Sequence, residues 1–372
     1  MENSKDFRIV MRSTKQKNYK RYKIKMSKIL YITKEQKKLW FKAGYLYLDN
    51  DLIIQFPITS YFKKIASKIR ILTRLLRLEP RNAVFLTNDL IIVAFLHKLF
   101  VISIELKKII TILDNRNGFS NPLNFCSMRN FGKEEVYWGD YGQNNNHEAI
   151  NIYKYTPNDG ITIVHTFKPG DIKHVHNIIF DKYRNSFLIF TGDFETKAGI
   201  YQATYDFSEI KPLLIGSQKY RAVQGIVFKN ELIYATDAVM ENNYIFSYSF
   251  ATQNLTVLEE LNGSVIYGTL VNDGIIFSTT VEPYPSSKSK IKTLLDNRKG
   301  KGIKSNHIDL YYISADKEIK RLHRFKKDLL PMRLFQYGAV TFPYYENQST
   351  TSIYTNPIAT TKYDGKNYII NL

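Results

Sequence analysis

Short apolar runs separated by polar turns recur along the chain, and they predict antiparallel strands. The clearest case is residues 173–193, KHVHNIIFDKYRNSFLIFTGD, in which two apolar runs flank a polar turn at 182–185. Aromatic and β-branched runs split by such a turn are typical of a β-hairpin. Similar pairs follow one another over residues 83–372, so we expect nearly all of this part to be β.

The hairpins repeat, and the repeat is visible at acidic residues that follow the second strand of each. These are Asp140, Asp193, Asp237 and Glu282, and the spacings between them are 53, 44 and 45 residues. A period in the forties built from four short strands is the signature of a propeller blade. We therefore predict an all-β fold, a β-propeller of about six four-stranded blades. The last blade, 333–372, would be completed by strands from the N-terminal region.

One segment breaks the β pattern and predicts a single amphipathic helix over residues 61–78. Its apolar residues recur at helical spacing among lysines and arginines, and Pro80 stops the helix; these apolar residues are Phe62, Ile65, Ile69, Leu72 and Leu76. We expect the helix to pack this apolar stripe on the propeller. Alternatively, a basic amphipathic helix can lie on an anionic membrane surface.

The formal net charge of +19 is concentrated at the N-terminus, where residues 1–40 hold thirteen Lys or Arg against three acids. This predicts a basic tail over 1–40, solvated or in peripheral contact with an anionic membrane, followed by one propeller domain over 41–372. A second basic stretch, 285–306, lacks apolar periodicity and predicts a mobile loop on the same face as the acids. No nucleic-acid-binding module is recognisable, so no specific nucleic-acid partner is expected.

Several classes of protein and site find no support in the sequence. There is no signal-peptide pattern and no run of about 18 apolar residues, so we expect a cytoplasmic protein that is peripheral to membranes at most. The single cysteine, Cys126, leaves no intrachain disulfide and no cysteine-based zinc site. Nucleotide-binding loops and the common hydrolase and zinc-protease motifs are absent, and no cofactor is predicted.

One turn carries a family resemblance. The run TPNDGITI at 156–163 is similar to the Asp-box, Ser-x-Asp-x-Gly-x-Thr-Trp, of sialidase-like (BNR) propellers, and Ser314-Ala315-Asp316 occupies the same place in a later blade. The wider pattern HVHN…TGD…GIY…GSQKYRAV…ATDA, within about 121–345, resembles uncharacterised propeller proteins of bacterial polysaccharide loci. The resemblance implies a propeller whose Asp-box pins a turn far from the functional site, and a role connected with glycans.

The residues that carry the chemistry are expected to meet at one mouth of the central channel. In a propeller, the start of the first strand and the end of the second strand of every blade lie on the same face. The residues predicted to act in catalysis, as general acid and base, are His174, His176, Asp193 and Asp237. The residues predicted to bind substrate are Arg221, Gln218, Asp140, Glu282, Asn177 and Gln336. No metal is assigned, although His174-x-His176 has both rings on one face of a strand, as metal ligands would.

Three functional hypotheses follow from these residues. The first is a carbohydrate-associated propeller, a glycan hydrolase or lyase acting on an acidic polysaccharide whose carboxylate is bound by the fork of Arg221. A sialidase uses three arginines for this purpose, whereas only Arg221 is assigned here. The second is a non-catalytic glycan-binding or surface-polysaccharide biosynthesis accessory protein. The third is a peripheral membrane protein that docks through residues 1–81. Each acid also has a simpler explanation, because Asp at a strand end often caps a turn.

Overall fold

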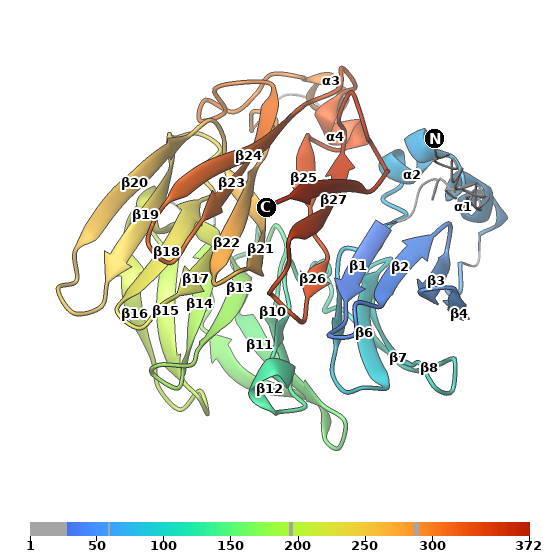
Figure 1. Cartoon of the computed structure of the whole chain (residues 1–372), viewed down its shortest axis with the longest axis horizontal. Coiled ribbons are helices and arrows are strands. Elements are labelled where there is room, and N and C mark those ends of the chain that lie inside the picture. The colour runs from blue at the N-terminus through green and yellow to red at the C-terminus, as the bar shows by residue number, and fades with distance from the viewer. Residues whose placement is uncertain (1–27, 59, 193–195, 286–289) are drawn as a thin grey trace, which may run out of the picture.

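The computed structural model describes residues 28–58, 60–192, 196–285 and 290–372. Their strands form seven sheets that follow one another around a ring (Figure 1). Five of these sheets have four strands, one has five and one has three. The protein is therefore an all-β, seven-bladed β-propeller built mostly of four-stranded blades.

The strands are numbered in chain order. The first two blades contain β1 (Lys28–Ile32), β2 (Lys38–Lys42), β3 (Tyr45–Leu48) and β4 (Asp51–Gln55), then β5 (Ala83–Phe85), β6 (Leu90–Phe95), β7 (Lys98–Ser103) and β8 (Lys108–Asp114). Blades three and four contain β9 (Cys126–Ser127), β10 (Val136–Gly139), β11 (Ile150–Thr156) and β12 (Gly160–Phe167), then β13 (His174–Asp181), β14 (Ser186–Gly192), β15 (Gly199–Thr204) and β16 (Ile210–Ile215).

Blades five and six contain β17 (Ala222–Val227), β18 (Glu231–Thr236), β19 (Asn243–Ser249) and β20 (Leu255–Leu261), then β21 (Val265–Val271), β22 (Gly274–Thr279), β23 (His307–Ile313) and β24 (Ile319–Lys326). The seventh contains β25 (Ala339–Thr341), β27 (Ser352–Ile358) and β28 (Tyr368–Asn371), while β26 (Tyr344–Tyr345) joins the first blade. The helices are α1 (Tyr61–Ala66), α2 (Arg70–Leu75), α3 (Lys290–Leu295) and α4 (Met332–Phe335), with 3-10 turns η1 (Arg129–Phe131) and η2 (Gln218–Tyr220).

The core lies between blades, because successive side chains of a strand point to opposite faces of its sheet. Strand β14 illustrates this alternation, since all its residues are buried. Phe187 packs toward blade three, with its ring centroid 4.8 Å from that of Tyr137. Leu188 and Phe190 belong instead to the apolar cluster that contains Tyr234 of blade five. Each blade therefore buries both faces only when its two neighbours are present.

The prediction of six blades is wrong by one, because residues 28–55 form a complete blade of their own instead of completing the last one. The predicted boundary of the basic tail at residue 40 is wrong for the same reason. Strand β1 contains the four buried residues 29–32, and its basic character comes from lysines at the strand ends and in the following turn. The predicted tail over residues 1–27 lies outside the described residues.

The C-terminal part of the chain closes the ring by pairing with the first blade. Strand β26 runs parallel to β1, with Tyr344 opposite Tyr31. The N–H of Glu346 donates to the carbonyl of Ile32 at 3.0 Å. The Glu346 carboxylate accepts a hydrogen bond from Arg129 Nε at 2.8 Å, and its side chain is 1% exposed. This pairing covers the inner edge of the first sheet, which would otherwise present unpaired backbone groups.

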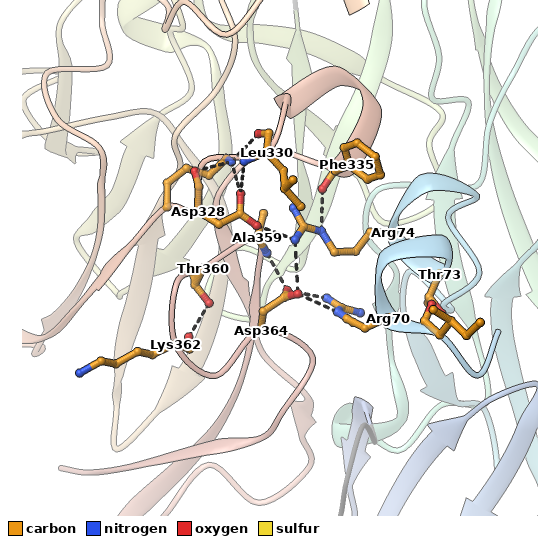
Figure 2. Close-up of polar contacts among 12 residues, drawn as sticks. Arg70, Thr73, Arg74, Asp328, Leu330, Phe335, Ala359, Thr360, Lys362 and Asp364 are labelled. Carbon is orange, nitrogen blue, oxygen red and sulfur yellow. Dashed lines mark hydrogen bonds and ion pairs between the residues drawn. The ribbon is translucent and has the colours of Figure 1, made fainter. Parts of the chain in front are cut away.

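The single helix predicted over 61–78 is two short helices, α1 and α2, and α2 contacts α4, which precedes the seventh blade. The first ends at Ser67, whose hydroxyl donates to the carbonyl of Lys64 at 2.8 Å. The prediction of the buried face is also wrong, since Arg74 is 3% exposed and Phe62 is 60% exposed. Arginine side chains of α2 bind acidic residues of the C-terminal segment (Figure 2), so the apolar side chains face outward. No helix within the described ranges is long and apolar enough to cross a membrane.

The insert 285–306 is structured over its described part, so the prediction of a mobile loop is wrong there. It contains α3, and residues 300–303 pack against blade five. A Cβ atom on Gly302 would lie 1.9 Å from the carbonyl oxygen of Glu241, which shows how closely the two backbones approach. The remaining part of the prediction concerns residues 286–289, which lie outside the described residues.

The Asp-box-like turn lies where the sequence predicts it, between β11 and β12, the third and fourth strands of blade three. Thr156 Oγ1 donates to Asp159 Oδ2 and accepts from the N–H of Asp159, both at 3.0 Å. Gly160 follows with a φ of +69°, a conformation that favours glycine. The turn is pinned by its own side chains at the end of the blade opposite to His174.

Candidate functional site

Three inner strands carry a bulge at the same position near the channel. The pairing of β13 with β14 skips His176, that of β17 with β18 skips Val223, and that of β21 with β22 skips Ile266. A bulged residue is left out of the ladder of its own sheet. Its carbonyl can therefore accept a hydrogen bond from another blade.

A side-chain amide from the preceding blade donates to each of these carbonyls. Asn124 Nδ2 donates to His176 O at 3.0 Å, Asn177 Nδ2 to Val223 O at 2.9 Å, and Gln224 Nε2 to Ile266 O at 3.2 Å. Asn82 Nδ2 makes the same link one blade earlier, to Leu123 O at 2.9 Å. Asn177, predicted to bind substrate, therefore joins two blades. The four amide residues, Asn82, Asn124, Asn177 and Gln224, recur at spacings of 42, 53 and 47 residues. The repeat recognised in the sequence was defined by the acidic residues and did not include this second one.

His174 and His176 face one another in the interior, and each is 3% exposed. Their Nε2 atoms are 2.9 Å apart, while Nδ1 of His174 lies 2.6 Å from Gly142 O and Nδ1 of His176 lies 2.8 Å from Ala222 O. A carbonyl oxygen only accepts, so both Nδ1 atoms carry a proton. The contact between the two Nε2 atoms is then a hydrogen bond only when one of the two rings carries a second proton.

A metal ion bound by both rings would need at least one further ligand from the protein. The residues that the structure describes contain no group of three or more His, Cys, Asp or Glu that could hold a metal ion. Gly192 allows the close approach, because a Cβ atom there would lie 2.1 Å from the His176 ring.

Arg221, Asp237 and Gln218 come together as the sequence predicts. Arg221 Nη2 lies 3.3 Å from Asp237 Oδ2, and Arg221 Nη1 donates to Gln218 Oε1 at 3.5 Å. Arg221 immediately precedes β17 and Asp237 immediately follows β18, so antiparallel pairing brings them to one end of the blade. Asp237 is 3% exposed, whereas the Arg221 side chain keeps 16% of its surface. Solvent therefore reaches Arg221 and Gln218, whereas Asp237 is buried.

Asp140 is held in a different set of contacts. It accepts from the N–H of Asn151 at 3.0 Å and from the hydroxyl of Tyr153 at 3.1 Å, and Arg116 Nη1 lies 3.3 Å away. Burial raises the pKa of the Asp140 carboxyl, although the N–H of Asn151 and the charge of Arg116 act in the opposite direction. These contacts fix the connection between β10 and β11, which is a structural role.

The remaining predicted residues are Glu282, Gln336 and Asp193. Glu282 accepts hydrogen bonds from the hydroxyls of Ser264 and Thr280, the latter at 2.8 Å. Gln336 follows α4 with a φ of +66°, and its buried Oε1 makes no hydrogen bond within the described part of the chain. Asp193, predicted to be catalytic, lies outside the described residues.

Three tyrosines that sequence reasoning missed lie in one cluster: Tyr141 follows β10, Tyr267 lies within β21 and Tyr337 precedes β25. Tyr141, Tyr267 and Tyr337 are half-buried and pack against the apolar cluster of Leu123, Val223 and Ile266. The hydroxyls of Tyr267 and Tyr337 are 3.4 Å apart. Burial raises the pKa of Tyr267 and of Tyr337, so both phenols are uncharged at neutral pH. No local motif marks these residues, because they come from three different blades.

Arginine side chains border these rings. The guanidinium of Arg81 lies 5.1 Å from the ring centroid of Tyr141, and the charge of Arg81 acts on Tyr267 as well. The charge of Asp237, the partner of Arg221, also acts on Tyr267. We call Arg81, Tyr141, Arg221, Tyr267 and Tyr337 the channel mouth. It retains exposed surface, whereas His174, His176 and Asp237 do not form the solvent-reachable pocket that the sequence suggested.

A cavity lies elsewhere on the molecule. It has a volume of about 430 Å³ and is lined by the β13–β14 turn and by residues of β15, β16 and their connection, including Arg184, Gln202 and Tyr205. This cavity is at the opposite end of β13 from His174. It contains none of the residues that the sequence singled out, and it offers a control position for experiments on the channel mouth.

Comparisons with known proteins give a fold and no family. No protein-family model matches the chain, and no curated protein matches its sequence. A chain of the mitotic checkpoint complex has a TM-score of 0.51 at 7% identity, covering 100% of this chain and 99% of that one. The extracellular domain of a hybrid two-component system from B. thetaiotaomicron has a TM-score of 0.49 at 10% identity, covering 93% and 39%. An oligogalacturonate lyase in complex with manganese has a TM-score of 0.45 at 7% identity, covering 77% and 74%. At 7% identity, the match to the checkpoint-complex chain indicates a shared fold and not an activity.

Proposed function

We propose that this protein is a non-catalytic binding module for an acidic glycan and that the channel mouth is its binding site. The observation that carries the proposal is the group of three half-buried tyrosines bordered by Arg81 and Arg221. Tyrosine offers an apolar ring face and a hydroxyl, which suits the mixed surface of a sugar ring. An arginine fork pairs with a carboxylate through two parallel hydrogen bonds.

The charge of the site favours an acidic ligand over a neutral one. Arg81 is exposed, and it lies over Tyr141 where a bound sugar would meet the ring. The Tyr267 and Tyr337 hydroxyls stay protonated because burial raises the pKa of both, so they can donate to sugar oxygens. The likeness of the 156–163 turn to the Asp-box of sialidase-like propellers is consistent with a role in glycan recognition.

The hydrolase alternative has weaker support than binding. General acid–base cleavage of a glycosidic bond needs two carboxyl groups that reach the bond from either side. Asp237 is 3% exposed and paired with Arg221, and Asp140 is held by Asn151, Tyr153 and Arg116. Catalysis would depend on Asp193 acting with one of them. Asp193→Asn would then abolish the release of reducing ends, whereas our proposal predicts no such release from the unmodified protein.

Calorimetric titration with polygalacturonate and hyaluronate, and with neutral dextran as the reference, tests the proposal. We expect binding of at least one acidic polymer and none of dextran. Arg81→Gln should weaken that binding about tenfold, because it removes one charge-assisted contact of 1.5–3 kcal/mol. Tyr267→Ala should have a comparable effect through the lost ring face.

The matched control is Arg184→Gln. Arg184 also lies over an aromatic ring, 3.4 Å from the centroid of Phe250, but it lines the cavity at the opposite end of blade four. We expect this variant to bind as the unmodified protein does. Loss of binding in Arg184→Gln with retention in Arg81→Gln would move the site to that cavity and overturn the proposal.

A further inference from the structure

Helices α1 and α2 present apolar side chains to solvent. Tyr61 is 77% exposed, Phe62 60%, Ile65 43% and Ile69 45%, and Ile71 and Leu75 are exposed as well. A soluble surface rarely gathers this many large apolar side chains on two adjacent turns of helix unless the surface contacts something. We call this set of residues the apolar face of α1–α2.

On α2, the outward orientation of the apolar side chains is fixed by ion pairs on the other side of the helix (Figure 2). Arg74 Nη1 lies 2.5 Å from Asp328 Oδ2, and Arg74 Nε donates to the carbonyl of Phe335 at 2.7 Å. Arg70 binds Asp364 through Nε and Nη2, at 3.0 and 2.8 Å. Turning the helices to bury their apolar side chains would break these pairs and leave buried charges without partners. The exposure is therefore built into the fold.

Cations surround the apolar face, and acids are absent from it. Lys63, Lys64 and Lys68 are exposed, and none of them forms an ion pair within the described part of the chain. Residues 52–78 contain no Asp or Glu. A hollow of about 100 Å³ beside the helices is lined by Lys42, Lys68 and Arg70, with Glu79 as its acid.

The basic N-terminal segment joins the fold next to this surface. Lys28 begins β1, and its Nζ donates to the carbonyl of Pro80, five residues after the end of α2, at 2.8 Å. Residues 1–27 contain nine Lys or Arg against two acids. This segment shares the positive sign of the lysines on α1–α2, so charge repulsion disfavours it as the cover of the apolar face. An anionic partner would attract both the basic N-terminal segment and the lysines on α1–α2.

We propose that the apolar face of α1–α2 docks on an anionic phospholipid surface. Large apolar side chains enter the boundary between headgroups and acyl chains, and flanking lysines contact the phosphates. Each basic residue near an anionic leaflet adds to the attraction, which falls with salt. Nucleic acid would use the cations but not the apolar side chains, and a second copy of this chain would bring positive charge against positive charge. This inference is independent of glycan binding at the channel mouth.

Vesicle cosedimentation of the full chain tests the inference, with phosphatidylcholine vesicles that contain about 30 mol % phosphatidylserine or none. We expect binding to the anionic vesicles only, and weaker binding at high salt. The pair Phe62→Ser and Ile65→Ser should reduce binding about tenfold or more, and the pair Lys63→Glu and Lys64→Glu should do the same. Both pairs change exposed side chains, and unchanged thermal unfolding would show that the fold is intact.

The control is a matched patch on blade two. Leu106 is 62% exposed and Ile110 46%, and Lys107 and Lys108 lie between them. Leu106→Ser with Ile110→Ser should bind vesicles as the unmodified protein does. The inference is wrong if the Phe62 and Ile65 variant binds equally well while deletion of residues 1–27 abolishes binding. It is also wrong if sedimentation shows a dimer that this variant converts to a monomer.

Discussion

At the scale of single residues, most polar side chains around the channel already have partners inside the protein. Asn177 links blades four and five, His174 and His176 contact each other through their Nε2 atoms, and Asp140 fixes a strand connection. These residues looked like a rim of binding groups because they recur with the period of the blades. The same period is expected of residues that hold blades together, and contacts distinguish the two roles.

The reassignment of Asn177 predicts the effect of a truncation. Asn177→Ala removes the donor to the Val223 carbonyl, so we expect the free energy of unfolding to fall by about 1–2 kcal/mol. Glycan binding should stay unchanged. Chemical denaturation followed by tyrosine fluorescence measures the first quantity, and Asn145→Ala, at an exposed asparagine, is the control. Loss of glycan binding without loss of stability would return Asn177 to the binding site.

At the scale of elements, the arginines of α2 decide how the segment between blades one and two is placed. Arg74 is buried among Asp328, Asp364 and the carbonyl of Phe335, and Lys327 donates to the other oxygen of Asp328. Gly365 leaves space for Arg70, because a Cβ atom there would lie 2.6 Å from Arg70 Nε. The network connects the segment between blades one and two to the last blade.

We expect Arg74→Met to lower the free energy of unfolding by about 3 kcal/mol, because it removes the arginine partner of the half-buried Asp328 and one of the two arginine partners of Asp364. Lys98→Met removes an exposed ion pair with Asp114 and should cost about 0.5 kcal/mol or less. Denaturant titration of both variants gives the comparison. Equal, small effects would contradict a structural role for the network.

The network also predicts a dependence on pH. Burial opposes ionisation of Asp328, but hydrogen bonds from Arg74 and Lys327 outweigh it and hold the pKa of this carboxyl below its ordinary 3.8. The stabilisation is therefore complete above the ordinary pKa and is lost as the pH falls through the lower value of the folded state. The stability difference between the unmodified protein and Arg74→Met should shrink below about pH 4. A difference that grows with acid would contradict this assignment.

Sequence patterns predicted the strands of blades two to six well, because each strand is a compact apolar run bounded by turn residues. They failed for α1–α2, since the partners of Arg74 are Asp328 and Asp364, more than 250 residues away in the chain. They also failed for β1, where lysines beside the buried run 29–32 suggested a solvated tail. The channel mouth was not found because its tyrosines come from separate blades and carry no common motif.

At the scale of the whole molecule, two sets of contacts connect the N-terminal and C-terminal parts of the fold. One is the arginine network of α2, and the other is the β1–β26 pairing with Glu346 and Arg129. The segment 61–81 contributes to both proposals, since α1–α2 carries the apolar face and Arg81 follows at the channel mouth. Docking on a lipid surface and binding of a glycan would thus occur on neighbouring parts of one structure.

Ring closure predicts coupled hydrogen exchange at the two ends of the fold. Peptides that cover residues 28–33 and 343–347 should exchange slowly and to the same extent. Glu346→Gln weakens the bond with Arg129 and should speed exchange in both, while β18 peptides stay unchanged. Mass spectrometry measures this, with Glu105→Gln at an exposed position as the control. Faster exchange in only one of the two peptides would mean that the ends are not coupled.

The claim that the channel mouth binds an acidic glycan is tested most directly by the role of the carboxylate itself. The measurement is the affinity of the unmodified protein and of Arg81→Gln for polygalacturonate and for the same polymer with its carboxyl groups reduced to alcohols. We predict that the unmodified protein prefers the carboxylated polymer about tenfold and that Arg81→Gln abolishes this preference. An equal affinity of the unmodified protein for both polymers, or a preference that survives in Arg81→Gln, would contradict the account.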